Sequence, residues 1–489
     1  MVAEQVHWSG GLRQERACLR VHGAGGTVHF ARHDEDLEDR QRPRGVRGLR
    51  QGLRHPQEGE FQRWLLNLLQ EGLLGPELPP GHQDGRRPHP RLRRQGGSLG
   101  GTCNAQTNRE YRVGVIGIGR AGTTRARAFD LHPLCQVVAL ADTDPENLAL
   151  GKKRFNCAGY STWAAMLANE RIDIALPVLP VQPNADAVVA SARAGVKAVF
   201  CEKPLTAKLA DADRMVNECA SRGIPLVCGS VVSSHPDYQK SYAMATSGEI
   251  GEIVRINLYE ANGQMGTHGL SHARKFAGKP DVDFVIGWCS GDANSDYEGD
   301  YGDGKQGYGW LGGYIRFKNG IECFSGYRPK SGLPWRGIEV IGTRGMIFNQ
   351  NNSSLGLRLF KAPAGVTPKA FSDLQEVKGA FSERTEREVT YDAEGWRQIG
   401  DVMIHTVQEM MDNLEHGKPI GAATGDYMRY ALEMTIGLWE SAQRGHAPVK
   451  FPIADRSLAA YPERSRWQYK KDVFGRDRYM AELGMQKKD

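Results

Sequence analysis

The first 106 residues contain no lysine, isoleucine or tyrosine, and no methionine after Met1. Arginine, glycine, proline and histidine are abundant there instead, which is the composition of GC-rich DNA read upstream of a true start or out of frame. From Tyr111 the composition becomes that of an ordinary globular protein. We therefore expect residues 1–105 to be a misassigned extension. The alternative is a disordered, arginine-rich arm, but the acidic cluster from Asp34 to Asp39 argues against that arm and against a transit peptide.

The 489-residue chain also lacks long apolar runs and any C-x-x-C pair among its nine cysteines. No run approaches the roughly 20 apolar residues that cross a bilayer, so we expect no membrane association. Cysteines that are scattered and odd in number indicate neither a zinc site nor a disulfide framework, and they favour a reducing cytoplasm. The net charge of +6 has its largest excess in the first hundred residues, so nucleic acid is not an expected partner.

The acidic segment from Asp292 to Lys305 resembles a calcium-binding loop in composition only. An EF-hand requires glycine at its sixth position, where this segment has Tyr297. We expect a solvated or substrate-capping loop there, with Trp310 and Trp335 near enough in sequence to pack on the apolar faces of a polyol. We expect no metal site.

A predicted strand, Tyr111 to Ile116, leads directly into the turn Gly117-Ile118-Gly119-Arg120-Ala121-Gly122 and then a helix. The first glycine permits a tight turn, the second lets backbone amides approach a pyrophosphate, and the third lets the helix lie close to the strand. The helix N-terminus then presents free N–H groups to the phosphates. Asp142 closes the next strand, where a carboxylate can accept hydrogen bonds from both ribose hydroxyls of NAD. We predict that these turn residues and Asp142 contact the cofactor.

The residues that follow Asp142 bear on the choice of cofactor. Thr143 and Asp144 offer no cation for the 2′-phosphate of NADP, so NAD is favoured over NADP. The alternative is that a cation of Lys152–Arg154 folds back toward the ribose.

Helical and strand-like segments alternate as far as residue 230. The expected strands after the first two are Ile172–Pro177, Ala198–Cys201 and Pro225–Gly229. The expected helices are Pro145–Phe155, Asn184–Ala194 and Ala210–Arg222. A further short helix, capped by Thr162, is expected to end at Asn169. Strands separated by helices predict βαβ crossovers. The sequence therefore predicts an α/β domain over residues 106–230, with a doubly wound parallel sheet of the Rossmann type.

Strands follow one another with few helices beyond residue 230. The expected strands are Glu252–Glu260, Phe284–Cys289, Tyr308–Phe317, Ile321–Tyr327 and Gly337–Gly342, and the expected helices are Asp237–Thr246, Trp396–Leu414 and Tyr427–Arg444. This order predicts an α+β domain with an open, largely antiparallel sheet over residues 231–455, followed by a tail, residues 456–489. One face of such a sheet needs covering, so we expect a homodimer or a homotetramer.

The segment Cys201-Glu202-Lys203-Pro204 lies at the C-terminal end of the predicted strand Ala198–Cys201, at the edge where open parallel sheets bind their ligands. A lysine there can hold a substrate hydroxyl close to a nicotinamide and favour its alkoxide. The alternative is an ordinary surface lysine at the end of a strand.

Several motifs follow in one order between about residues 110 and 455. They are the glycine turn, the acid-ended strand, A-G-V-K-A-V-F-C-E-K-P (Ala194 to Pro204), S-G-E-I-G-E-I (Ser247 to Ile253), G-T-H (Gly266 to His268) and E-S-A-Q-R-G-H-A-P-V (Glu440 to Val449). Together they resemble the Gfo/Idh/MocA family of glucose-fructose oxidoreductase, inositol dehydrogenase and rhizopine-catabolism proteins. The resemblance implies an N-terminal NAD(P) domain, a C-terminal domain with an open sheet, and hydride exchange at a secondary alcohol or ketone of a sugar, sugar derivative or cyclitol.

The resemblance also implies roles for particular residues. Lys203 matches the substrate-binding lysine of the E-K-P motif, and His268 matches the histidine that usually acts as acid or base. Further implied cofactor contacts are Pro180, Asn184, Glu202 and Lys203, and implied substrate contacts are Lys203, Gln264, His268 and His272.

The chain departs from the family pattern near the predicted catalytic histidine. The aspartate four residues before it is replaced by Gln264, and the aspartate often found three residues after it is replaced by Ser271. Glutamine cannot exchange a proton at neutral pH, so His268 would carry the proton alone or with help from His272. In the loop after the fourth strand, relatives often show Thr-Pro and then His, whereas this chain has Leu179-Pro180 and Asn184.

The principal prediction is an NAD-dependent dehydrogenase or reductase acting on a sugar or cyclitol. A second possibility is redox-neutral glycoside cleavage, in which NAD oxidises the sugar transiently. A third is a non-catalytic, NAD-responsive binding protein, motivated by the loss of the usual aspartate at Gln264.

Overall fold

The computed structural model describes residues 111–229, 231–259, 263–294, 311–326, 337–349, 356–382, 401–421 and 423–460. All of them fall within one unit of the chain, Gly72–Asp489, and the other unit, Met1–Glu71, lies outside the described residues. Three other predicted features lie outside the described residues. They are the extension, most of the capping loop with the nearby Trp310 and Trp335, and the chain after residue 460. Among the described helices, none combines the length and apolarity needed to cross a bilayer.

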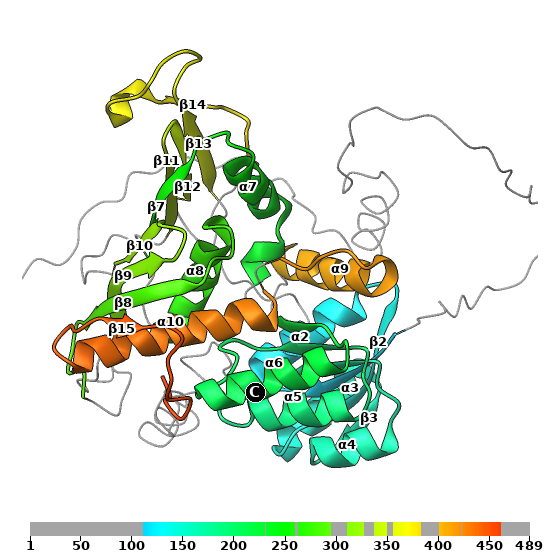
Figure 1. Cartoon of the computed structure of the whole chain (residues 1–489). Helices are drawn as coiled ribbons and strands as arrows, with labels where there is room; N and C mark the ends of the chain where they lie inside the picture. Colours follow the sequence, from blue (N-terminus) through cyan, green and yellow to red (C-terminus); the bar gives the residue numbers. More distant parts are fainter. Residues whose placement is uncertain are drawn as a thin grey trace, which may run out of the picture. The chain divides into compact units, whose positions relative to one another are not determined.

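The first sheet contains six parallel strands in the order β3-β2-β1-β4-β5-β6 (Figure 1). Its strands are β1 (Tyr111–Ile116), β2 (Cys135–Ala141), β3 (Ala158–Tyr160), β4 (Ile174–Pro177), β5 (Ala198–Cys201) and β6 (Leu226–Cys228). The order reverses between β1 and β4, which creates a switch point at the carboxyl ends of these two strands. The predicted doubly wound Rossmann sheet is confirmed.

Helices cover both faces of this sheet. They are α2 (Arg120–Asp130), α3 (Pro145–Phe155), α4 (Trp163–Asn169), α5 (Asn184–Arg193) and α6 (Leu209–Ser221). Phe129 of α2 belongs to the apolar core on one face, and Val188 of α5 belongs to the core on the other. Asp144 and Thr162 accept hydrogen bonds from the first N–H groups of α3 and α4, which fixes where these two helices begin.

The second sheet contains nine strands in the order β14-β13-β12-β11-β7-β10-β9-β8-β15. They are β7 (Ile253–Leu258), β8 (Val282–Cys289), β9 (Leu311–Phe317), β10 (Glu322–Ser325), β11 (Ile338–Gly342), β12 (Gly345–Asn349), β13 (Leu357–Lys361), β14 (Gln375–Glu376) and β15 (Val449–Lys450). Neighbouring strands are antiparallel except β7 and β10, which are parallel. The predicted largely antiparallel sheet is therefore confirmed, with β12 to β15 added to the expected strands.

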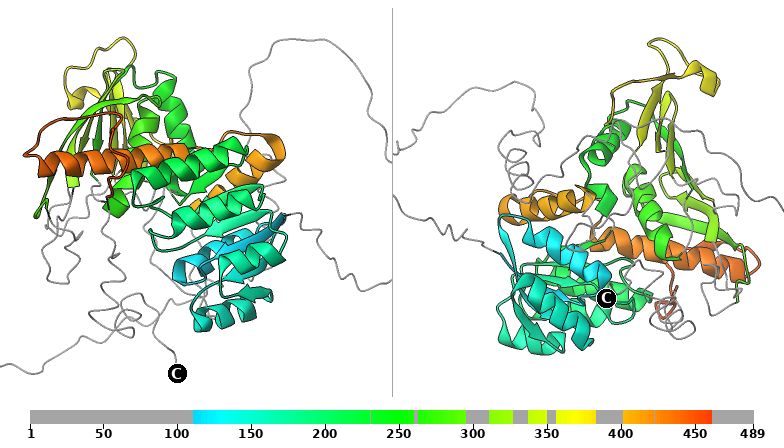
Figure 2. Two further views of the ribbon diagram at one scale, coloured as in Figure 1. Left: turned by 60° about the horizontal axis from the view of Figure 1, so that its bottom comes forward. Right: turned by 180° about the vertical axis from the view of Figure 1, so that it is seen from behind.

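The helical elements of the second part are η1 (Val231–Ser234), α7 (Pro236–Thr246), α8 (Gly263–Phe276), η2 (Phe371–Asp373), α9 (Asp401–His416) and α10 (Gly425–Gln443). Helix α10 lies along β8 and β9 (Figure 2). Two glycines paired across these strands allow the close approach: a Cβ on Gly287 would lie 1.9 Å from the carbonyl oxygen of Leu438, and one on Gly313 would lie 2.3 Å from its side chain. Larger residues at either position would push the helix away from the sheet.

Helix α8 is absent from the elements predicted by sequence. Its first half contains Gly263, Gly266 and Gly269, each about 1 kcal/mol less favourable in a helix than alanine. Its second half buries Leu270 and Phe276 in the main apolar core. Packing on this core, and on α10, outweighs the weak helix propensity of the glycine-rich half.

The residues after β15 return to the first domain instead of forming a free tail. The N–H of Leu209, at the start of α6, donates to the carbonyl of Leu458. The guanidinium of Arg456 donates to both carboxylate oxygens of Asp213 on α6, at 2.7 and 2.9 Å, and to Glu433 of α10 at 2.7 Å. The described part of the predicted tail is thus a strap that joins α6 to α10.

Replacing Arg456 with alanine should lower the free energy of unfolding by roughly 3 kcal/mol, because the Glu433 carboxylate, only 3 % exposed, would lose its cation. Chemical denaturation followed by circular dichroism measures this loss. Arg214→Ala is the matched control, because it removes exposed ion pairs on the same helix and should cost about 0.5 kcal/mol or less. Equal losses in the two variants would contradict the structural role of the strap.

Candidate functional site

The three glycines of the turn between β1 and α2 have different surroundings. Gly117 has a φ of +88°, and a Cβ there would lie 2.5 Å from the carbonyl oxygen of Val178. A Cβ on Gly122 would lie 1.9 Å from the carbonyl oxygen of Gly117, whereas one on Gly119 would meet no described atom within 4 Å. Glycine is therefore required sterically at the first and third positions. The open space at Gly119 fits the close approach of a pyrophosphate.

Helix α2 begins at Arg120, directly after this open position. No side chain caps its first N–H groups, and its first turn contains no acidic residue. Free donors at the positive end of the helix dipole suit an anion. Ile118, Arg120 and Ala121 are placed at this terminus, and their contact with NAD stays a prediction.

The carboxylate of Asp142 is held against the glycine turn. Its Oδ2 accepts a hydrogen bond of 2.7 Å from the N–H of Ile118, and its Oδ1 accepts one of 2.8 Å from the N–H of Asp144. Each carboxylate oxygen has a second lone pair, so both ribose hydroxyls of NAD can still donate to it. The structure thus places the acid predicted for the ribose beside the turn predicted for the phosphates.

The cations considered as partners of a 2′-phosphate lie at the other end of α3. Asp144 caps the N-terminus of this helix, and Lys152, Lys153 and Arg154 occupy its last turn. At 1.5 Å per residue, about 12 Å of helix separates Asp144 from Lys152. These cations therefore do not fold back toward Asp142.

The E-K-P segment is tied to the helix that starts at the glycine turn. Glu202, directly after β5, is 9 % exposed and accepts a hydrogen bond of 3.0 Å from Nε of Arg125 on α2. A Cβ on Gly229 would lie 3.1 Å from the Glu202 carboxylate oxygens and from the backbone nitrogen of Lys203, so the end of β6 also packs closely on this segment. Lys203 itself is half-buried. Sequence analysis does not identify Arg125, because its partner is 77 positions away.

The loop after β4 meets the same segment. Asn184, the first residue of α5, is 1 % exposed, and its Nδ2 lies 3.5 Å from the carbonyl oxygen of Pro204. Its Oδ1 has no hydrogen-bond partner among the described residues. Pro180 is exposed in the same loop. Asn184 is therefore placed beside the turn that carries Lys203, and the contacts of Asn184 and Pro180 with cofactor stay predictions.

Helix α8 carries the predicted substrate-binding residues of the second domain. His268 is half-buried, and its carbonyl accepts a hydrogen bond of 2.8 Å from the hydroxyl of Ser271. Gln264 lies one turn earlier in the same helix, and its side chain is outside the described residues. Since Lys203 belongs to the first domain and His268 to the second, their meeting at one substrate stays a prediction.

His272 occupies a different environment from His268. It is 5 % exposed, and its ring lies 5.1 Å from the ring of Tyr238. Burial, with the charge of Lys275 nearby, lowers the pKa of His272 to about 3. The side chain is therefore a neutral member of an aromatic core, which argues against direct help in proton transfer.

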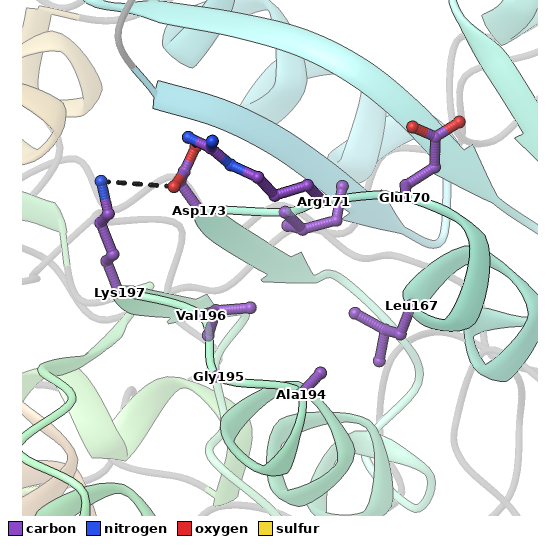
Figure 3. A pocket seen from close by; sticks show the side chains of 9 residues that line it. Leu167, Glu170, Arg171, Asp173, Ala194, Gly195, Val196 and Lys197 are labelled. Atoms are coloured by element: carbon purple, nitrogen blue, oxygen red, sulfur yellow. Dashed lines mark ion pairs between the residues drawn. The ribbon is translucent and has the colours of Figure 1, made fainter.

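Two cavities of the first domain lie at the opposite edge of its sheet. One has a volume of about 320 Å³ and surrounds Asp173, toward which Arg171 and Lys197 are directed (Figure 3). The other, of about 580 Å³, includes Lys152 and Lys153 in its lining. Both border the amino ends of strands, whereas open α/β sheets bind ligands at the carboxyl ends. We therefore do not include them in the candidate site.

The described groups of the candidate site fit nucleotide binding, and proton transfer by His268 stays a prediction. Among the described residues, no group of three or more His, Cys, Asp or Glu side chains is placed to hold a metal ion. The uncapped helix terminus, the open space at Gly119 and the carboxylate of Asp142 fit the pyrophosphate and ribose of a dinucleotide.

Comparison with known proteins points to one family. Residues 111–230 match the GFO_IDH_MocA family model, an oxidoreductase family with an NAD-binding Rossmann fold. The chain is 30% identical over 148 residues to myo-inositol 2-dehydrogenase of Thermotoga maritima, which covers 30% of this chain and 44% of that protein. It is 27% identical over 141 residues to 2,7-anhydro-N-acetylneuraminate hydratase of Escherichia coli, which covers 29% of this chain and 37% of that protein.

A third relative is dTDP-3,4-didehydro-2,6-dideoxy-alpha-D-glucose 3-reductase of Streptomyces violaceoruber, 30% identical over 155 residues, which is 32% of this chain and 45% of that protein. The chain thus spans about two fifths of the length of the curated relatives that it matches.

Solved structures resemble a longer part of the chain. An oxidoreductase from Agrobacterium radiobacter in complex with NAD+, L-tartaric acid and magnesium has a TM-score of 0.55 at 21% identity, with coverage of 70% of this chain and 98% of that one. Myo-inositol 2-dehydrogenase from Lactobacillus plantarum has a TM-score of 0.52 at 19% identity, with coverage of 70% and 99%. At these identities the likeness shows the shared two-domain fold. The match of residues 111–230 to this NAD-binding oxidoreductase family agrees with the resemblance of the sequence motifs.

Proposed function

We propose that the protein is an NAD-dependent oxidoreductase that transfers a hydride between nicotinamide and a secondary alcohol or ketone of a sugar, sugar derivative or cyclitol. The observation that carries the proposal is the NAD-binding domain of this family, with the E-K-P segment tied to its glycine-turn helix by the Arg125–Glu202 ion pair. Two of the matched relatives are a dehydrogenase of myo-inositol and a reductase of a nucleotide-linked sugar.

NAD is the proposed cofactor in preference to NADP. The carboxylate of Asp142 would repel a 2′-phosphate, and the cations of Lys152–Arg154 are in the last turn of α3, too far away to compensate for that repulsion. The ribose hydroxyls of NAD can instead donate to the free lone pairs of this carboxylate.

Lys203 and His268 are the proposed reactive groups. The ammonium of Lys203, at the carboxyl end of β5, would bind the reacting oxygen and stabilise negative charge on it. The imidazole of His268 would take the proton from that oxygen during oxidation and return it during reduction, because imidazole exchanges protons near neutral pH. NAD, when bound, supplies the hydride acceptor or donor. Gln264 would hydrogen-bond a neighbouring substrate hydroxyl, and we leave His272 out of the proton transfer because it is buried and neutral.

The two alternative functions have less support. The redox-neutral, glycoside-cleaving reading is not favoured, since two of the relatives named above are a dehydrogenase and a reductase, although the third is named a hydratase. The turnover measurement described below tests the alternative that the protein binds NAD without catalysing a reaction.

We further propose that a second copy of the chain covers the open face of the second sheet. Side chains alternate along its strands: Ile315 and Cys323 are buried, whereas their neighbours Tyr314 and Phe324 are half-buried. The rings of Tyr314 and Phe324 lie 5.1 Å apart, and the guanidinium of Arg255 lies 5.0 Å from the Phe324 ring. A face that combines aromatic rings and cations suits a protein interface. This supports a homodimer or a homotetramer.

The purified chain should reduce NAD with at least one member of a panel of hexoses, pentoses and inositols, measured as NADH absorbance. His268→Ala should lower that turnover about a hundredfold, because the proton acceptor is lost, while the Kd for NAD changes little. His416→Ala, at an exposed histidine, is the control and should change neither quantity. Unchanged turnover in His268→Ala would remove His268 from the mechanism, and NAD binding without turnover on any compound would support the non-catalytic reading.

The stability of the protein should fall in acid partly through His272. Its folded-state pKa of about 3 lies below the ordinary value of 6.5, so the neutral ring stabilises the fold above about pH 6.5. This contribution is lost as the pH falls from about 6.5 toward 3, at up to about 1.4 kcal/mol per pH unit. Denaturation between about pH 6 and pH 4 should show a flatter pH dependence in His272→Gln than in the wild type. His416→Gln should keep the wild-type slope, and equal slopes in all three proteins would contradict the assignment.

Phe324→Asp should shift the sedimentation coefficient toward that of a monomer, because the apolar contact of the ring is lost and burial of the new carboxylate at an interface costs desolvation free energy. Val366→Asp, at a residue 39 % exposed and outside this face, should leave the sedimentation coefficient unchanged. A wild-type protein that sediments as a monomer at micromolar concentration would rule out the proposed self-association.

A further inference from the structure

A partly buried polar cluster connects helix α8 to three other elements. It consists of Lys275 of α8, Gln239 of α7, Ser234 of η1 and Glu409 of α9, and we call it the Lys275 cluster. Ser234 and Gln239 donate hydrogen bonds of 2.5 and 3.3 Å to the Glu409 carboxylate. The ammonium of Lys275 donates to Oε1 of Gln239 at 3.4 Å and lies 4.4 Å from the centre of the Tyr242 ring. The cluster thus brings one cation and one anion into a largely apolar environment.

The two charges of the cluster face each other across Gly421. The N–H of Gly421 donates to Oε1 of Glu409 at 2.7 Å. A Cβ on this glycine would lie 3.1 Å from the same oxygen and 3.3 Å from Nζ of Lys275. Burial raises the pKa of Glu409 and lowers that of Lys275, and the charge of each partner opposes the effect on the other. The attraction between the two charges therefore offsets part of the free-energy cost of burying them.

Helix α9 connects this cluster to the cofactor domain. Val407 and Met410 of α9 are buried in the same apolar core as Phe129 of α2. Gln408 also lies 3.3 Å from the ring of His132, just after α2. Glu409 lies on another face of α9, directed toward Ser234. The position of the Glu409 carboxylate is therefore set by a helix that packs against the helix of the glycine turn.

Helix α8 connects the cluster to the predicted catalytic histidine. Lys275 follows His268 by seven residues, which is two helical turns, or about 10 Å, on the same side of the helix. Other residues of α8 hold it to its own domain: Arg274 stacks on the ring of Tyr430 at 3.5 Å and pairs with Asp426, both on α10. Lys275 instead contacts Gln239 and Tyr242 of α7, and Gln239 in turn donates to Glu409 of α9. A displacement of α8 along its axis would therefore have two effects at once: it would move His268, and it would increase the distance between Lys275 and Glu409.

We propose that Lys275 is a positioning residue, whose interaction with Glu409 sets helix α8, and with it His268, at a fixed place relative to NAD on the first domain. The inference rests on the function proposed above. A displacement of α8 would take the partly buried ammonium of Lys275 away from Gln239 and from the nearby carboxylate of Glu409, and a desolvated charge that loses its partners costs free energy. Neither Lys275 nor Glu409 touches the substrate in this arrangement.

Three substitutions test the proposal in the full-length protein. Lys275→Met removes the cation at nearly constant volume, Glu409→Gln removes the anion, and Lys275→Arg keeps the charge. With the best substrate of the sugar and cyclitol panel, the first two should lower kcat at least about tenfold, because small displacements of a reacting group are costly. The KM for substrate and the Kd for NAD should stay within about twofold, since binding groups are retained. Lys275→Arg should recover most of the activity.

Lys279→Met is the matched control. Lys279 follows α8 by three residues, is 54 % exposed in its side chain and pairs with Asp426 instead of Glu409. Its substitution should leave kcat unchanged. A loss of kcat in Lys279→Met equal to that in Lys275→Met, or no recovery in Lys275→Arg, would overturn the proposal.

Hydrogen exchange gives a readout that does not depend on turnover. In Lys275→Met, the backbone amides of α8 should exchange roughly tenfold faster than in the wild type, while those of β1 and α5 stay unchanged. Unchanged exchange in α8 would overturn the proposal. Should either single substitution prevent folding, the double variant Lys275→Met/Glu409→Gln replaces it, because it leaves neither charge buried alone. If the wild type turns over no compound of the panel, the proposed function fails, and exchange still decides whether Lys275 holds α8.

Discussion

The packing of Gly122 against the carbonyl of Gly117 is the contact on which the cofactor site depends. Any side chain at residue 122 would overlap that carbonyl oxygen, so this contact sets how close α2 lies to β1. The position of α2 in turn directs Arg125 toward Glu202, whose backbone continues into Lys203. A single steric constraint therefore links the turn predicted for the phosphates to the lysine predicted for the substrate. Both predicted contacts belong to the first domain, and the Arg125–Glu202 ion pair links them.

Contacts between the two domains are of another kind, because buried charges take part in them. The strap places Arg456 between Asp213 of α6 and Glu433 of α10, and the Lys275 cluster joins α8 to α9. Apolar packing stabilises an interface over a range of relative positions, but a buried charge is satisfied in only one. The proposed hydride transfer would require donor and acceptor in contact, with Lys203 on one domain and His268 on the other. Polar contacts of this type are suited to that requirement.

Local sequence predicts some elements of the fold well and others not at all. The bounds predicted for β1 and β5 agree with the structure residue for residue, since short apolar runs between turn residues are typical of buried parallel strands. Helix α8 escapes prediction because its glycines oppose a helix and its support comes from α10, which is far away in the sequence. Local sequence patterns cannot predict the ion pair of Arg125 and Glu202, because only the folded chain brings these two residues together. The same holds for His272, whose neighbours in the core distinguish it from His268.

The path of the strap also determines the order in which the protein can be completed during synthesis. The N–H of Leu209 in the first domain bonds to the carbonyl of Leu458, and the N–H of Cys228 on the edge strand β6 bonds to the carbonyl of Ala423. At a translation rate of about 5 to 20 residues per second, the interval between Leu209 and Leu458 takes on the order of 10 to 50 s. The edge of the nascent sheet at β6 stays open until Ala423 has been made, and the start of α6 lacks this partner until Leu458 has been made. The Rossmann domain is continuous in sequence, but its last backbone partners come from residues more than 190 positions further along the chain.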